Sequence, residues 1–180
     1  MEKWISRIDN ITSKFLDSFA HLSQEQLNWK PDPSNWSIAQ NVEHLINLNS
    51  SYFPTFENLK KGRQPLPFIA RFGFVVSFFG NMIKKSVEPE RQKKMKTFPI
   101  WEPSKSDLPK SILNDFQENQ EKLKEYISDS ADLIHQNMVI SSPVNKNIVY
   151  KLEAAFDIIV THEERHYNQA MEVLSQLPEN

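Results

Sequence analysis

The sequence predicts an all-α protein, a single domain over residues 1–180 built as a four-helix bundle with long crossover connections. Three observations lead to this fold class. Four long stretches repeat apolar residues at three- and four-residue steps, which is the period of an amphipathic helix. The chain has only three glycines, too few for the many turns of an all-β fold. Two long connections separate the stretches, which favours crossovers over a simple up-and-down order.

The first two helices are predicted from their apolar stripes and from signals at their ends. The first stripe predicts a helix over about 2–22, and two prolines soon follow it. Ser37 has the character of an N-cap for a second helix over about 38–61. Gly62 is placed to end that helix.

The rest of the chain is predicted to hold two more long helices and a shorter aromatic one. An aromatic-rich stretch at 68–85 predicts the shorter helix. Residues 86–109 contain four prolines and predict a long crossing loop, which is unusual unless it covers something. Helices are expected over about 107–128 and 149–177, and residues 129–147 are expected to form a second connection in which no strand is visible.

The composition excludes several classes of function. A formal net charge of −2 argues against a nucleic-acid binder, which needs a basic surplus. The absence of cysteine excludes disulfides, thiolate metal sites and a cysteine nucleophile, and three scattered glycines exclude a phosphate-binding loop. The N-terminus lacks the features of a signal peptide, which predicts a cytoplasmic protein. The longest apolar run, 68–83, contains Arg71 and is short for a membrane span, so no stable membrane insertion is expected.

The most informative stretch contains His162 and His166. Residues four apart share one helix face, so the two imidazoles can share a metal ion. They also continue the apolar stripe between Ile159 and Ala170, where buried side chains are expected and polar nitrogens need partners. The alternative is a chance spacing, with two core histidines that hydrogen-bond to neighbours. The stripe favours a metal site.

A third ligand has to come from another helix. His44 lies at the margin of the apolar stripe of the second helix, and bundles build metal sites from facing helices. His21 is at a helix end and His135 is in a connection, so both are expected to be exposed.

Residues 162–166 also match the H-E-x-x-H pattern of zinc metallopeptidases. Such enzymes take a third ligand from further along the chain, and no histidine follows His166. A peptidase also usually offers a strand edge to its substrate. The metallopeptidase is therefore the less favoured alternative.

Three segments together resemble the DinB superfamily, which includes YfiT-like metal-dependent hydrolases and bacillithiol S-transferases. They are LNWKP at 27–31, NWSIAQNVEHL at 35–45, and the near-C-terminal pattern of His162, His166 and Gln169. The resemblance covers the first, second and last long helices.

The resemblance implies a fold, a site and an activity. It implies an up-down-down-up bundle, often dimeric, in which His44, His162 and His166 hold a divalent metal. Zinc and nickel are favoured, with manganese or iron as alternatives. The implied function is a metal-dependent thiol S-transferase or hydrolase that acts on a small molecule. The S-transferase would use a low-molecular-weight thiol as its second substrate. The alternative is a non-catalytic metal-binding or stress-related interaction domain.

Three further residues are candidates near this site. Glu163 is the natural general base, although it points about 100° away from His162 on the helix, so a solvated or supporting carboxylate is an equal alternative. Asn41 and Gln169 each lie one turn from a histidine and are expected to orient a ligand or line the pocket.

The aromatic run at 68–79 has two interpretations: a buried helix that completes the core or a dimer contact, or a wall for an apolar substrate. The basic residues after it have two interpretations as well: a solvated face, or a contact for an anionic substrate or a membrane surface. They are Lys84, Lys85, Arg91, Lys93, Lys94 and Lys96.

Overall fold

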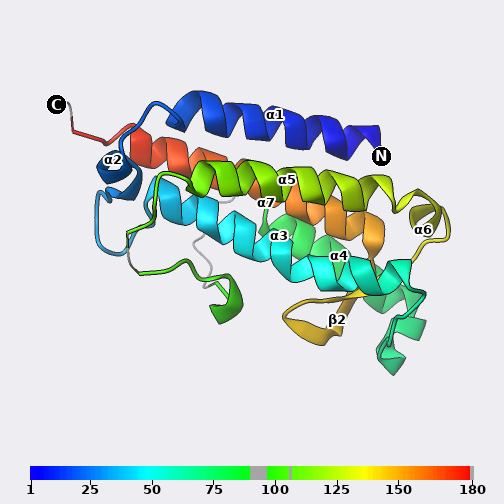
Figure 1. Ribbon diagram of the computed structural model, residues 1–180. Helices are drawn as coiled ribbons and strands as arrows, with labels where there is room; N and C mark the ends of the chain where they lie inside the picture. Colours follow the sequence, from blue (N-terminus) through cyan, green and yellow to red (C-terminus); the bar gives the residue numbers. More distant parts are fainter. Residues whose placement is uncertain (90–96, 106, 179–180) are drawn as a thin grey trace.

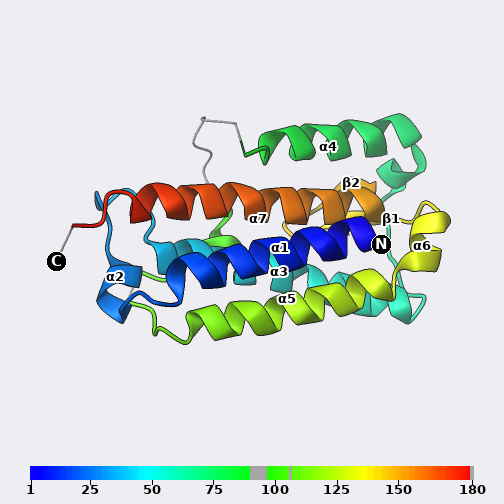
Figure 2. The ribbon, with the colours of Figure 1, turned by 90° about the horizontal axis from the view of Figure 1, so that it is seen from above.

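The computed structural model describes residues 1–89, 97–105 and 107–178 and is mostly helical. Figures 1 and 2 show that two of the long helices run in one direction and two in the other, in an up-down-down-up order. This confirms the predicted four-helix bundle with crossovers. The four long helices are α1 (Glu2–Phe19), α3 (Ile38–Lys60), α5 (Ile112–Ser128) and α7 (Leu152–Leu174).

Shorter helical elements occupy the connections. Because α3 and α5 run in the same direction, the chain between them has to return along the bundle, and three of these elements lie on that crossover (Figure 1). None of the helices in the described ranges combines the length and apolar character needed to span a bilayer. The connecting elements are α2 (Gln24–Asn28), η1 (Phe68–Arg71), α4 (Gly73–Ser86), η2 (Pro99–Trp101) and α6 (Ala131–His135).

The second connection contains a β-hairpin, which the sequence interpretation missed. Strands β1 (Val139–Ser142) and β2 (Asn145–Lys151) pair antiparallel, with Ile140 opposite Tyr150. Residues at the predicted start of the last helix belong instead to β2. The physical reason is local: β-branched and aromatic residues cluster in both strands and favour an extended backbone.

The start of α3 is fixed by a capping box, as the sequence predicts. The Ser37 hydroxyl accepts a hydrogen bond from the backbone N–H of Gln40, and the Gln40 side chain accepts one from the backbone N–H of Ser37. Gly62, with φ +64°, follows the helix in the left-handed region that glycine adopts most readily. This cap sets where Asn41 and His44 fall along the helix.

The core is divided into two apolar clusters with a polar layer between them. One cluster is centred on Phe56 and Phe156, and the other on Phe15 and Phe116. Between the clusters, α3, α5 and α7 each contribute buried polar side chains that hydrogen-bond to one another. The layer consists of Asn49, Asn119, Gln120 and Glu163.

The aromatic helix is not buried in the core, so that part of the first interpretation is wrong, while the dimer contact named beside it stays a prediction. Helix α4 lies beside α7 at the edge of the molecule (Figure 2), and Phe74 and Phe78 are 75% and 60% exposed. Its inner side packs on β2 and α7 through buried Val76 and Gly80. Neither of the two apolar core clusters of the described residues contains a buried residue of α4.

The predicted basic cluster is only partly described. Lys84 pairs with Asp157 on α7 at 2.9 Å, so it contributes to packing α4 on the bundle. Arg91, Lys93, Lys94 and Lys96 lie outside the described residues.

Candidate metal centre

Three histidines from two antiparallel helices meet inside the molecule. His44 is on α3, and His162 and His166 are one turn apart on α7. The Nε2 atoms of His162 and His166 are 2.9 Å apart, and one ring nitrogen from each of the three residues lies within 4.8 Å of the others. His21 and His135 are exposed elsewhere. The structure thus brings together the three residues that the sequence selected.

Two of the imidazoles are held in a defined tautomer. The Nδ1 of His44 lies 2.6 Å from the backbone oxygen of Trp101, and the Nδ1 of His166 lies 2.8 Å from Oδ1 of Asn41. Asn41 in turn donates from Nδ2 to the backbone oxygen of Ser37, which identifies its Oδ1 as the atom facing His166. Since both partners of the rings are acceptors, each Nδ1 carries the proton and each Nε2 keeps a lone pair.

All three imidazoles are in their neutral form at neutral pH. Burial lowers the pKa of His44 to about 4, although its hydrogen bond to Trp101 opposes this shift. Burial also lowers the pKa of His162 and of His166 well below the usual range, and the neighbouring histidines and Arg165 add to the shift. Neutral imidazole is the form that binds metal ions, so these rings need not lose a charge first.

The donor set fits a divalent metal ion. The Nε2 of His44 is buried and has no hydrogen-bond partner among the described residues, an arrangement that is costly without a cation or a donor nearby. The 2.9 Å contact between the Nε2 atoms of His162 and His166 is satisfied by an N–H···N hydrogen bond, and the same two nitrogens are close enough to bind one metal ion when both are deprotonated. Three neutral nitrogen donors suit zinc and leave further coordination positions for water or substrate.

The histidine cluster opens into a cavity of about 1280 Å³. Trp36 forms part of its wall, with its ring 4.8 Å from that of His44. Met82, Ile83 and Val87, in and just after α4, form another part. None of the residues of the aromatic run at 68–79, all of which the structure describes, lines the cavity, so the interpretation of that run as a wall of an apolar site is wrong; the residues that follow it along the chain supply this part of the wall.

The remaining predicted residues fall in different places. Asn41 and Gln169 both line the cavity, and Asn41 also holds His166. Glu163 does not line it. Its carboxylate is fully buried in the polar layer of the core, where it accepts hydrogen bonds from Asn49 at 2.8 Å and Gln120 at 3.0 Å.

The position of Glu163 bears on its chemistry. Burial raises the pKa of Glu163 to about 7, and the two amide hydrogen bonds oppose that shift. A general base has to reach the proton that it removes, and the carboxylate faces the bundle interior instead of the cavity. The H-E-x-x-H peptidase mechanism needs this glutamate at the metal, so the arrangement argues against it.

Sequence reasoning missed four contributors to the site. Trp101 holds His44 through a backbone oxygen, which no side-chain pattern can reveal. Arg165 lines the cavity and donates to the backbone oxygens of Ser86 and Glu88; its spacing from His162 was a usable signal. Tyr52 and Tyr150 also line the cavity, with hydroxyl oxygens 2.7 Å apart.

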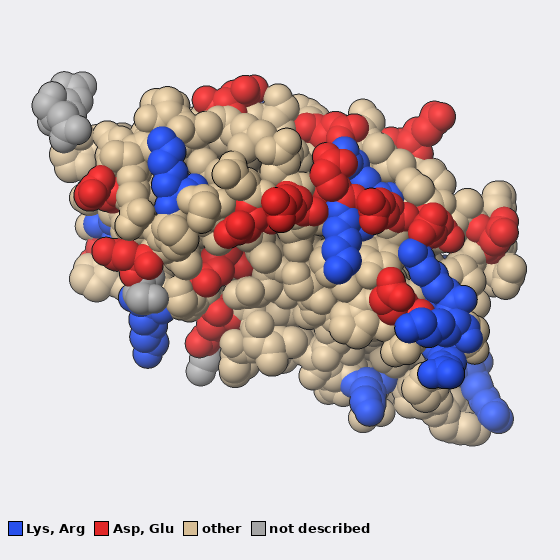
Figure 3. Space-filling view, viewed as in Figure 1, with Lys and Arg blue, Asp and Glu red and all other residues tan. Residues whose placement is uncertain are grey.

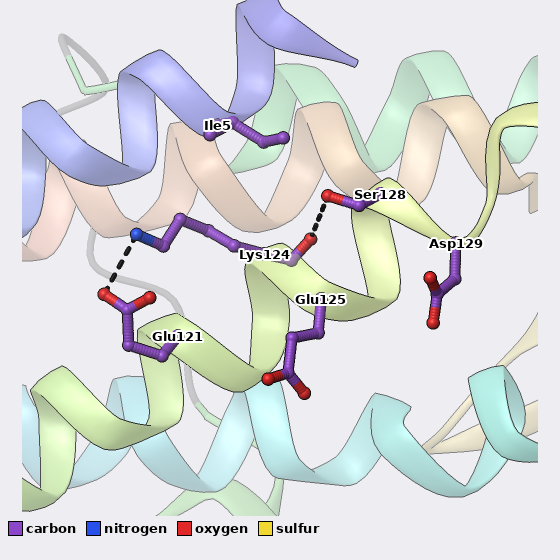
Figure 4. A pocket seen from close by; sticks show the side chains of 6 residues that line it. All are labelled: Ile5, Glu121, Lys124, Glu125, Ser128 and Asp129. Carbon is purple, nitrogen blue, oxygen red and sulfur yellow. Dashed lines mark hydrogen bonds and ion pairs between the residues drawn. The ribbon is translucent and has the colours of Figure 1, made fainter.

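A second hollow lies between α1 and α5, beside Ile5 and Lys124 (Figure 4). Lys124 pairs there with Glu121 at 2.9 Å and with Asp9 at 2.7 Å, and none of the three clustered histidines lines it. Exposed ion pairs of this kind are common on protein surfaces. We therefore place the candidate site at the histidine cluster.

The fold and the site together define a class of protein: a crossover helical bundle with a three-histidine cluster in a cavity. A family model described as the DinB superfamily matches residues 7–170, and the chain belongs to that superfamily.

Comparison with solved structures gives the same fold. YfiT from Bacillus subtilis, described as "a probable metal-dependent hydrolase with an unusual four-helix bundle topology", superposes with a TM-score of 0.60 at 16% sequence identity. The match covers 97% of this chain and 86% of that one. A search of curated proteins found no significant match.

Proposed function

We propose that this protein is a divalent-metal-dependent enzyme that acts on a small molecule, as a hydrolase or a thiol S-transferase. The observation that carries the proposal is the Nε2 of His44, a buried nitrogen with no partner among the described residues, within a histidine cluster that borders a large cavity. The fold shared with YfiT, described as a probable metal-dependent hydrolase, supports it.

His44, His162 and His166 would hold the ion. When bound, a divalent metal supplies a Lewis acid that lowers the pKa of a water or thiol beside it. Trp101 and Asn41 keep two of the imidazoles oriented, which limits the reorganisation that binding requires.

The walls of the cavity indicate the kind of substrate. Apolar side chains such as Leu48 and Ile158 continue from the histidines toward the Tyr52–Tyr150 hydroxyl pair, and Gln169 and Arg165 add polar groups. A small molecule with an apolar body and a polar reacting group fits such a lining.

The identity of the metal stays a prediction. Neutral imidazoles suit zinc and nickel, which we favour, and they also accept manganese or iron. The homodimer and the cytoplasmic location likewise stay predictions.

Metal content and turnover test the proposal separately. Purified protein loaded with Zn²⁺, Ni²⁺ or Mn²⁺ is analysed for bound metal, beside His44→Ala, His162→Ala, His166→Ala and the control His135→Ala. We expect the first three variants to lose the metal and the control to keep it. Undiminished metal in all three would refute the ligand assignment.

Turnover is then measured with bacillithiol-type thiols and a chloro-aromatic acceptor, and with a panel of small esters and amides. Activity that requires the metal supports the enzyme. Binding of metal without turnover across both panels, with a melting temperature that falls on metal removal, supports the non-catalytic metal-binding domain instead.

A further inference from the structure

The crossover between α3 and α5 carries an unusual exposed aromatic face. Phe68 is 68% exposed, Phe72 42%, Phe74 75% and Phe78 60%, and the first three rings form a chain of contacts with centroids 5.6 and 6.1 Å apart. We call these four residues the phenylalanine face. Exposed apolar clusters of this kind mark an interaction surface.

The phenylalanine face is held firmly by the opposite side of α4. A Cβ placed on Gly80 would lie 3.5 Å from the Cβ atoms of Ala154 and Tyr150, so α4 approaches α7 and β2 closely at this point. Val76, one turn before Gly80, is also buried. One side of α4 is therefore packed against the bundle, and the exposed rings project from its other side.

The stretch of sequence that carries this face has charged residues of one sign, although three of its lysines form ion pairs with carboxylates from outside the stretch: Lys60 with Asp129, Lys61 with Glu57 and Lys84 with Asp157. Residues 58–87 contain six Lys or Arg and no Asp or Glu, in a chain whose formal net charge is −2. The guanidinium of Arg71 lies 5.2 Å from the ring centre of Phe68. Neither Arg71 nor Arg63 forms an ion pair with a carboxylate in the described part of the chain. Figure 3 shows Lys and Arg gathered at the end of α3 and over the segment that follows.

Two kinds of occupant can cover an apolar face of this size. A second copy of the chain would bury the rings, but a two-fold contact would also bring the two basic segments toward each other. An anionic lipid surface accepts apolar rings at the level of its headgroups and attracts the basic residues beside them. The charge pattern therefore favours the lipid surface.

We infer that the phenylalanine face docks this protein reversibly onto membranes that contain anionic lipid, with the rings entering the interface and Arg63 and Arg71 contacting phosphate groups. This is peripheral binding and needs no spanning helix. Because Met82, Ile83 and Val87 form a wall of the histidine cavity, docking also brings that cavity close to the lipid.

Vesicle flotation tests this inference with the full chain. We expect the protein to float with vesicles of phosphatidylcholine and phosphatidylglycerol, to float much less with phosphatidylcholine alone, and to be released by added salt. The double variant Phe74→Ser/Phe78→Ser should bind anionic vesicles at least about tenfold more weakly, because two exposed rings no longer enter the interface. Arg63→Glu/Arg71→Glu should remove the preference for anionic lipid.

The control is Ile100→Ser, which changes a side chain that is 57% exposed on η2, away from the phenylalanine face. It should bind vesicles as the unchanged protein does, and all variants should unfold at the same temperature. Absence of binding to anionic vesicles would overturn the inference, as would equal binding by the phenylalanine variant. A dimer in sedimentation that becomes a monomer in that variant, without vesicle binding, would assign the face to a second copy.

Discussion

Substitution of Asn41 tests whether the histidine cluster is held ready for a metal. In the structure, Asn41 accepts the Nδ1–H of His166 at 2.8 Å and donates to the backbone oxygen of Ser37 at 2.9 Å, and its side chain is buried. Asn41→Ala removes both hydrogen bonds. The ring of His166 then loses the acceptor that fixes its tautomer and orientation.

The size of the effect follows from these two contacts. Loss of the partner that orients a ligating histidine typically weakens metal affinity by about 10- to 100-fold, which is about 1.4–2.7 kcal/mol. The buried N–H and carbonyl left without partners should also lower the free energy of unfolding by about 1–3 kcal/mol. The metal affinity is the more specific readout, since many buried substitutions lower stability.

The assay is a competition titration of Zn²⁺ between the protein and a chromophoric chelator. Gln169→Ala is the matched control, because Gln169 lines the same cavity and forms no hydrogen bond with the three imidazoles of the described structure. We expect the control to bind Zn²⁺ within about threefold of the unchanged protein. Equal affinities for Asn41→Ala and the unchanged protein would refute the orienting role of Asn41.

Three other predictions follow from buried side chains. Glu163→Gln should keep bound metal and any metal-dependent activity. Its free energy of unfolding should fall by about 1–3 kcal/mol, because the new amide no longer matches the amides of Asn49 and Gln120. A rate loss of about 100-fold or more with the metal retained would instead identify Glu163 as the general base. Burial raises the pKa of Tyr150 to about 12. Since an unfolded tyrosine ionises near pH 10, its contribution to the free energy of unfolding is complete below pH 10 and falls by about 2–3 kcal/mol between pH 10 and 12. Urea unfolding of Tyr150→Phe over that range should show a smaller decline, and an identical decline would contradict the assignment. Phe15→Ala should lower the free energy of unfolding by about 3–5 kcal/mol in the same assay, because the ring is fully buried; a loss below about 1 kcal/mol would mean that the core around it rearranges.

The sequence predicted the local features of this protein well. Apolar periodicity located the four long helices, and Ser37 and Gly62 marked the ends of α3, because these signals act within a few residues. The spacing of His162 and His166 placed both on one face of α7 for the same reason. The hairpin was missed because its short β-branched strand directly precedes a helix, and the apolar pattern continues across the boundary.

Tertiary structure decided which groups surround the candidate ligands. The carbonyl of Trp101 holds His44 only because the long crossover returns past α3, 57 residues along the chain. Glu163 turned into the core, not the cavity, because α3 and α5 supply the amides that satisfy its carboxylate there. Within the ranges that the structure describes, the two buried core clusters are built from the four long helices, the hairpin and residues of the connections, without a buried residue of α4, and α4 lies at the edge with its aromatic side outward. Contacts between distant segments depend on how the helices pack, and that information is absent from any local pattern of residues.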